Sequence, residues 1–186
     1  MDSPPDAELV RRFVGGDRDA FAMLVQRHER RVYNVAYRML GRREDAVDAV
    51  QDVFLSCLRK LHAFRGDAAF TTWLYRVTMN VCYDLLRKRT RDEPAGEELP
   101  ETPVPDRTDA SAAAIDVHRA LARIPEEFRA VVILHDLQGQ PYEDVAEALG
   151  APLGTVKSRL HRGRVMLARA LREPSDRVPP SYSEEP

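Results

Sequence analysis

The chain has 186 residues, of which 28 are Lys or Arg and 30 are Asp or Glu, so its formal net charge is −2. With 44% hydrophobic and 31% charged residues, its composition excludes disordered and fibrous proteins. No apolar run reaches the roughly 18 residues that span a bilayer, and the first residues lack a secretory pattern. We therefore expect a cytoplasmic protein without membrane insertion. The two cysteines, Cys57 and Cys82, exclude a four-cysteine zinc site and are expected to be buried structural thiols.

Charge is unevenly distributed along the chain, so the near-neutral total does not exclude a nucleic-acid-binding protein. Residues 21–91 carry a net charge of +7, and residues 151–172 carry +6 without any acidic side chain. Residues 92–116 carry −7 and hold four prolines, which favours a flexible connection. We predict two small domains (5–91 and 111–172), a flexible acidic linker (92–110) and a disordered tail (173–186).

Both predicted domains have the hydrophobic period of helices. Between Phe21 and Met39, apolar residues recur at spacings of three and four. Asp17 or Asp19 can cap this helix at its start, and Gly41 can end it. Further helices are expected over about 44–61, 71–89, 111–123, 126–137, 141–149 and 153–171. Because no alternating strand pattern competes, the predicted fold class is all-α.

The segment 141–164 has the spacing of a helix-turn-helix, with a short helix that ends at Gly150 and a second helix from about Leu153. At about 100° per residue, one side of the second helix is apolar and packs. Its members are Leu153, Val156, Leu160, Gly163 and Leu167. Ser158, His161 and Arg162 lie opposite, Thr155 lies beside them, and Lys157, Arg159 and Arg164 flank the packed side. This arrangement suits a DNA major groove; the alternative is a solvated basic helix.

The segment 64–80 interleaves aromatic and basic residues around Gly66. Aromatic faces can stack on unpaired bases, and arginines such as Arg65 and Arg76 can steer the backbone. Asn80 can bond a base edge, and Arg87, Lys88, Arg89 and Arg91 form a basic patch for phosphates. The alternative is a structural role, which is the stronger interpretation for Phe70 and at least as strong for Trp73.

Three carboxylates, Asp45, Asp48 and Asp52, recur at helical spacing. The apolar side of that helix is expected to contain Val47, Val50, Phe54, Leu58 and Leu61. Metal ligands usually come from loops or several elements, and no histidine joins this row. We therefore expect no metal site but an acidic ridge that faces a basic protein surface.

Together these segments resemble the bacterial RNA polymerase sigma factors of the extracytoplasmic function (ECF) group, in the sigma-70 family. Asp45–Leu55 resembles the polymerase-binding helix, and Phe64–Arg76 with Asn80 resembles the promoter-melting segment. Ile124–Leu134 resembles the opening of the second domain, and Tyr142–Gly150 with Gly154–Arg164 resembles the recognition-helix region. The four occur in the family's order. One departure is Gly163, where the family commonly has Ala.

The resemblance implies a factor that binds core RNA polymerase and directs promoter-specific initiation, with no catalytic residue and no cofactor of its own. Contacts with the β′ clamp helices would fall on Asp45, Asp48, Gln51 and Asp52, and β would be a further contact. Recognition and melting of the −10 element would use Phe64, Arg65, Gly66, Asp67, Trp73, Arg76, Asn80, Arg87, Lys88 and Arg89. Recognition of the −35 element would use Thr155, Lys157, Ser158, Arg159, His161, Arg162 and Arg164. An anti-sigma factor is an expected partner.

Two other functions are compatible with parts of the sequence. The C-terminal domain alone would suit a helix-turn-helix repressor or a response-regulator-type effector, but neither needs the 64–80 segment. A hydrolase could use the three carboxylates with His28 or His62, but HExxH, GxSxG and phosphate-loop motifs are absent. We therefore expect that the protein is not an enzyme.

Overall fold

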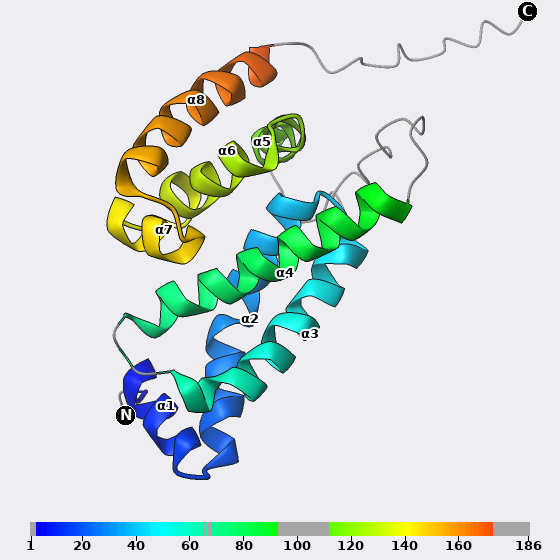
Figure 1. Ribbon diagram of the computed structural model, residues 1–186. Helices are drawn as coiled ribbons and strands as arrows, with labels where there is room; N and C mark the ends of the chain where they lie inside the picture. Colours follow the sequence, from blue (N-terminus) through cyan, green and yellow to red (C-terminus); the bar gives the residue numbers. More distant parts are fainter. Residues whose placement is uncertain (1–2, 65, 67, 93–111, 173–186) are drawn as a thin grey trace, which may run out of the picture.

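The computed structural model describes residues 3–64, 66, 68–92 and 112–172. Four helices form an N-terminal helical group: α1 (Asp6–Val14), α2 (Arg18–Leu40), α3 (Arg43–Lys60) and α4 (Phe70–Asp92). Four more form a C-terminal helical group: α5 (Ala112–Ala122), α6 (Glu126–Val132), α7 (Tyr142–Leu149) and α8 (Leu153–Arg172) (Figure 1). These ranges contain no strand, so the predicted all-α class is confirmed. The predicted tail and all of the predicted linker but Asp92 lie outside the described residues.

Local chemistry sets the ends of the predicted helices. One carboxylate oxygen of Asp17 accepts hydrogen bonds from the N–H groups of Asp19 (3.0 Å) and Ala20 (3.3 Å), which caps α2. Gly41 ends the same helix at φ +82°, a conformation that glycine adopts without steric cost. The predicted 126–137 helix divides instead, because the Gln138 N–H bonds the carbonyl five residues earlier and widens the last turns into a π-helix (Ile133–Leu137).

Helix α1 was not among the helices predicted from the hydrophobic pattern. It buries Leu9, Val10 and Phe13 against α2 and the 3₁₀ turn Leu61–Ala63. A helix of nine residues is marginal alone, so its stability comes from this packing.

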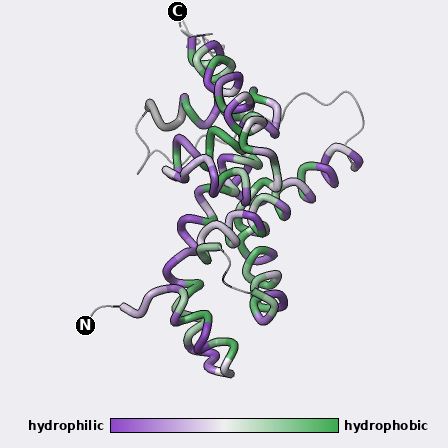
Figure 2. Tube along the Cα trace, turned by 60° about the vertical axis from the view of Figure 1, so that its left-hand side comes forward, coloured by the Kyte–Doolittle hydropathy of each residue, from purple (hydrophilic) through white to green (hydrophobic). Residues whose placement is uncertain are grey.

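Two hydrophobic clusters form the core of the molecule. Within each helix, hydrophobic and hydrophilic residues alternate along the chain, as the colours of Figure 2 show. One cluster lies within the N-terminal helical group and includes Leu9, Leu24, Val53 and Leu74. The other contains residues of both groups, so α2 and α4 share a core with α5–α8. In Figure 1 the C-terminal helical group accordingly lies along α4, which contacts α7.

Three polar side chains converge on the C-terminal end of α2. The Arg129 guanidinium, only 9% exposed, donates hydrogen bonds to the carbonyls of Met39 in α2 and Ile124 after α5. Arg89 of α4 donates to the Leu40 carbonyl at 3.3 Å, and His118 Nε2 lies 3.3 Å from the Gly41 carbonyl. The last carbonyls of a helix lack partners within it and carry partial negative charge, so donors and cations are favoured here.

The two thiols are buried, as the sequence predicted. Cys57 packs in the N-terminal cluster and Cys82 in the shared cluster. Burial disfavours the charged thiolate and raises the pKa of each thiol to about 12. Both are therefore protonated and unreactive at neutral pH.

Candidate polymerase and nucleic-acid interfaces

Helix α3 presents the acidic ridge on an accessible surface. Asp48, Gln51 and Asp52 are exposed, and Asp45 is half-buried. The Asp45 carboxylate lies 3.8 Å from the Arg89 guanidinium of α4. Asp45, predicted to bind polymerase, thus forms an ion pair with Arg89, predicted to bind DNA. This pair links the start of α3 to the last turns of α4.

The apolar residues of α3 divide differently from the sequence prediction. Val47 and Leu58 were expected on the buried side, but they are 45% and 44% exposed. Leu55 is also 51% exposed, whereas the core is contacted by Ala46 and Ala49 together with Phe54 and Leu61, which are buried as predicted. Val47, Leu55 and Leu58 lie on one side of α3 at helical spacing, with the polar Gln51 between the first two, so exposed apolar residues run beside the carboxylates. The helical spacing of these apolar residues next to the carboxylates is the sequence signal that could have revealed this surface.

No metal site is evident at the carboxylates. Across the described ranges, no three His, Cys, Asp or Glu side chains gather where they could hold an ion. His28, the candidate catalytic partner of these carboxylates, is buried and lies 2.8 Å from Asp6 instead. Within the same ranges, no helix combines the length and apolar character needed to traverse a bilayer.

The 64–80 segment forms an aromatic cluster of Phe64, Phe70 and Trp73. The ring centroid of Phe64 lies 5.4 Å from that of Trp73 and 6.3 Å from that of Phe70. Phe70 is buried, whereas Phe64 and Trp73 remain half-exposed, and Gly66 is exposed at φ +77°. Arg65 and Asp67 lie outside the described residues. The cluster therefore keeps two aromatic rings accessible beside a turn of the chain.

Helix α4 extends this surface with polar side chains. Arg76, Asn80 and Arg87 are exposed and fall within about 40° around the helix axis at 100° per residue. Arg87 pairs with Asp84 on the same helix. Lys88 is also exposed, whereas Arg89 is half-buried by its contacts with Asp45 and Leu40.

The C-terminal helical group forms the predicted helix-turn-helix. Gly150 ends α7 at φ +60°, and α8 begins three residues later. Val156, Leu160 and Gly163 are buried, while Lys157, Ser158, His161, Arg162 and Arg164 are exposed. Thr155 and Arg159 are half-buried. The exposed face of α8 therefore holds hydrogen-bonding and cationic groups, and none of its residues is acidic.

Some cations of α8 already have partners within the protein. Arg164 donates two hydrogen bonds to Asp136, at 3.0 and 2.6 Å, and this carboxylate raises the pKa of the guanidinium. The Lys157 ammonium lies 5.7 Å from the centre of the Tyr142 ring. The sequence did not indicate either contact, because both partners come from other elements. Arg162 is exposed, so its guanidinium is more available to an external partner than that of Arg164, which is paired with Asp136.

Gly163 lies on the packed side of α8, as the helical period predicted. A Cβ atom at this position would lie 2.8 Å from Val132 Cγ2 and 3.1 Å from the Phe128 carbonyl oxygen. The missing side chain thus lets α8 approach α6 closely.

Comparisons with known proteins match both helical groups. Residues 24–92 match the family model Sigma-70 region 2, and residues 114–167 match Sigma-70, region 4. The ECF RNA polymerase sigma factor SigM of Mycobacterium tuberculosis is 46% identical over 166 residues, which are 89% of this chain and 84% of that protein.

Two solved structures are similar over most of their length. The sigma factor RpoE from Bartonella quintana, in complex with the anti-sigma factor NepR, gives a TM-score of 0.73 at 26% identity. That match covers 84% of this chain and 98% of RpoE. CnrH, in complex with the cytosolic domain of CnrY, gives a TM-score of 0.70 at 25% identity, over 91% of this chain and 99% of CnrH. With a relative 46% identical across both helical groups, the chain belongs to the ECF group of RNA polymerase sigma factors.

Proposed function

We propose that the chain performs promoter-specific initiation through three separate surfaces. The exposed face of α3 binds core RNA polymerase, the 64–80 segment with α4 binds and opens the −10 element, and α8 binds the −35 element. The observation that carries the proposal is the face of α8, where Ser158, His161 and Arg162 are exposed directly after the Gly150 turn. From this position a recognition helix enters the major groove, with polar side chains directed at base edges and cations at phosphates.

Contacts of two kinds are expected at the −35 element. Ser158 and His161 contact base edges and determine the sequence, whereas Arg162 and Lys157 bind phosphates and determine orientation. Ser158 Oγ donates to the Thr155 carbonyl at 2.9 Å, so its lone pairs remain available to a base donor.

Promoter opening follows from preferential binding of unpaired bases. The half-exposed rings of Phe64 and Trp73 offer stacking surfaces, and Asn80 offers an amide on the same side of the domain as Arg76. Binding of extruded bases stabilises the melted strand and offsets the cost of unpairing, which is a few kcal/mol per base. No reaction at a residue of this chain is needed.

Helix α3 offers polymerase a surface with both charge and apolar area. Asp48 and Asp52 attract a basic surface, and Leu55 and Leu58 supply the apolar contacts that interface cores need. Since polymerase and promoters are in the cytoplasm, we place the protein there. An anti-sigma factor is a further proposed partner, supported by the likeness to RpoE bound to NepR.

Run-off transcription with core RNA polymerase and genomic fragments tests the proposal. The chain should produce promoter-dependent transcripts, and Asp48→Ala or Arg162→Ala should reduce them. Glu29→Ala and Arg30→Ala, which remove exposed charges from α2, are matched controls that should leave transcription unchanged. DNA binding by the free chain with no transcript from any fragment would instead indicate a repressor.

A further inference from the structure

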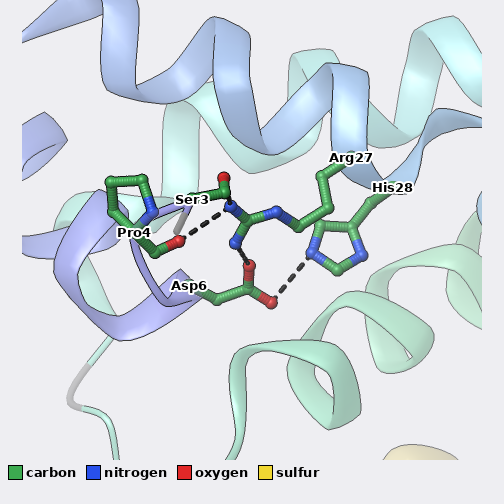
Figure 3. Close-up of polar contacts among 5 residues, drawn as sticks. All are labelled: Ser3, Pro4, Asp6, Arg27 and His28. Atoms are coloured by element: carbon green, nitrogen blue, oxygen red, sulfur yellow. Dashed lines mark hydrogen bonds and ion pairs between the residues drawn. The ribbon is translucent and has the colours of Figure 1, made fainter. Parts of the chain in front are cut away.

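A polar cluster attaches the start of the chain to α2 (Figure 3). One carboxylate oxygen of Asp6 accepts a hydrogen bond from Arg27 Nη1 at 2.5 Å, and the other lies 2.8 Å from His28 Nε2. Arg27 also donates to Ser3 Oγ at 2.5 Å and to the Pro4 carbonyl at 2.7 Å. The first turn of α1 and the residues before it are therefore held by two neighbouring side chains of α2.

The contacts of His28 indicate a neutral imidazole that donates to Asp6. The residue is 2% exposed, and Nδ1 has no partner in the part of the chain that the structure describes. Burial lowers the pKa of His28, against the opposing effect of Asp6. A proton on Nδ1 would be an unsatisfied buried donor, so the neutral ring with Nε2–H directed at the carboxylate is favoured.

The His28 ring packs on the aromatic cluster of the promoter-opening segment. Its centroid lies 5.4 Å from that of Phe70, the first residue of α4. Phe70 in turn lies 5.9 Å from Trp73 and contacts Phe64 edge-on. A continuous series of contacts thus runs from Asp6 to Phe64.

Helix α1 also contacts the other end of that segment. The Phe13 ring lies 4.9 Å from the ring of His62, in the 3₁₀ turn that directly precedes Phe64. One short helix therefore contacts the residues before Phe64 and, through His28, the residue that starts α4. This relationship involves residues before position 24, where the match to Sigma-70 region 2 begins.

We propose that Asp6 and His28 are positioning residues for −10 recognition, and that α1 is part of the promoter-opening apparatus. The Asp6–His28 hydrogen bond holds the imidazole against Phe70 and so fixes the aromatic cluster before DNA binds. A site that is already ordered loses less entropy on binding an extruded base. The inference rests on the function proposed above and adds a role for the N-terminal helix.

The fluorescence of Trp73 tests the positioning directly, because it is the only tryptophan of the chain. In the free full-length protein, Asp6→Ala should change the fluorescence emission of Trp73. Asp6→Asn should keep the wild-type emission, because its amide oxygen still accepts a hydrogen bond from His28. Arg12→Gln breaks a different ion pair, to Asp17, and is the matched control. Trp73 emission unaffected by Asp6→Ala would overturn the inference.

Promoter opening by the holoenzyme tests the functional consequence. On a promoter found by run-off transcription, Asp6→Ala should reduce permanganate-detected opening about fivefold to tenfold. Its affinity for core polymerase should not change, and Asp6→Asn should recover opening. His28→Gln, which can still bond Asp6 but lacks the ring on Phe70, should reproduce the defect. It replaces Asp6→Ala in the test if that variant fails to fold.

Loss of opening only in proportion to loss of core binding would contradict the inference. If the wild-type holoenzyme opens no promoter, the proposed function fails, and the Trp73 measurement still decides the positioning.

Discussion

Arg129 donates a hydrogen bond to the main-chain oxygen of Met39, which lies 90 residues earlier in the chain. The same guanidinium donates to the carbonyls of Ala122 (3.1 Å) and Ile124 (2.8 Å). A single cation therefore satisfies carbonyls at the ends of two helices, one in each helical group. Its location in the shared core makes it a test of how strongly the two groups hold together.

Arg129→Met should lower the free energy of unfolding by about 2–4 kcal/mol, because it leaves buried carbonyls unpaired. Urea denaturation followed by circular dichroism measures this change. The control is Arg123→Met, which replaces an exposed arginine directly after α5 and should change stability by less than about 0.5 kcal/mol. Equal effects of the two substitutions would show that the Arg129 contacts add no stability.

His118 should make stability depend on pH below neutrality. Its ring stacks on Tyr37 with centroids 4.0 Å apart, and burial lowers the pKa of His118 from its ordinary value of 6.5. The contact with the Gly41 carbonyl opposes this shift, and the charges of Arg38 and Arg129 add to it. The unfolded chain therefore binds a proton more readily, so the free energy of unfolding falls as the pH drops below 6.5. The pKa of His28 is lowered too and adds to the same trend.

Unfolding in urea at pH 7.5 and pH 5.5 tests this dependence. His118→Phe keeps a ring against Tyr37 but cannot titrate, so it should lose less stability on acidification than the wild type. His161→Ala removes an exposed histidine and should keep the wild-type dependence. An unchanged difference between the two pH values in His118→Phe would exclude His118 as a source.

Gly163→Ala should destabilise the fold even though Ala favours helices by about 1 kcal/mol. The new Cβ would lie 2.8 Å from Val132 Cγ2, and overpacking of this kind costs about 1–3 kcal/mol. Gly154→Ala in the same helix meets no atom within 4 Å and should be neutral or stabilising. Thermal unfolding should give a lower Tm for Gly163→Ala and an equal or higher Tm for Gly154→Ala. An unchanged or higher Tm for Gly163→Ala would contradict the close contact between α6 and α8.

Leu55→Ala should weaken binding to core polymerase by about 1 kcal/mol, or roughly fivefold, without loss of stability. The residue is 51% exposed, so its apolar surface is available to a partner. Val14→Ala on α1 removes a comparable exposed side chain and is the control. In a binding assay with labelled core enzyme, Leu55→Ala should bind more weakly than Val14→Ala. Equal affinities of the two variants would show that Leu55 is not in the interface.

Arg162 and Arg164 should contribute differently to promoter affinity. Both are exposed, but Arg164 is neutralised by two hydrogen bonds to Asp136. Arg162→Ala should weaken holoenzyme binding to promoter DNA and reduce the salt slope by about 1. Arg164→Ala should have a smaller effect on both. A larger salt-slope change for Arg164 would mean that DNA displaces Asp136.

Features set by local chemistry could be predicted from the sequence. Asp17, Gly41 and Gly150 occupy the capping positions expected of them, because capping depends on neighbouring backbone groups. The buried and exposed sides of α8 likewise follow from the helical period, since Val156 and Leu160 pack inward.

Features that depend on distant contacts could not be predicted. Arg129 and His118 have the chemistry of surface residues, yet both are buried by contacts with the end of α2. Helix α1 was missed although Leu9, Val10 and Phe13 have helical spacing, because a helix of nine residues depends on packing against α2 that the sequence does not show. Val47 was assigned to the wrong side of α3 because small alanines give a close contact that hydrophobicity alone does not indicate.

The core shared by the two helical groups has a consequence for the energy of promoter binding. Elements centred at −35 and −10 lie 25 positions apart, or about 85 Å at about 3.4 Å per base pair. A globular protein of this length has a radius of gyration of only about 16 Å. If each half binds one element, as proposed above, the protein separates its two halves before both elements are bound. The free energy needed for this separation reduces its affinity for free DNA. Polymerase, by holding the halves apart, would restore that affinity. A variant with a weaker shared core would accordingly bind promoter DNA more tightly in the absence of polymerase.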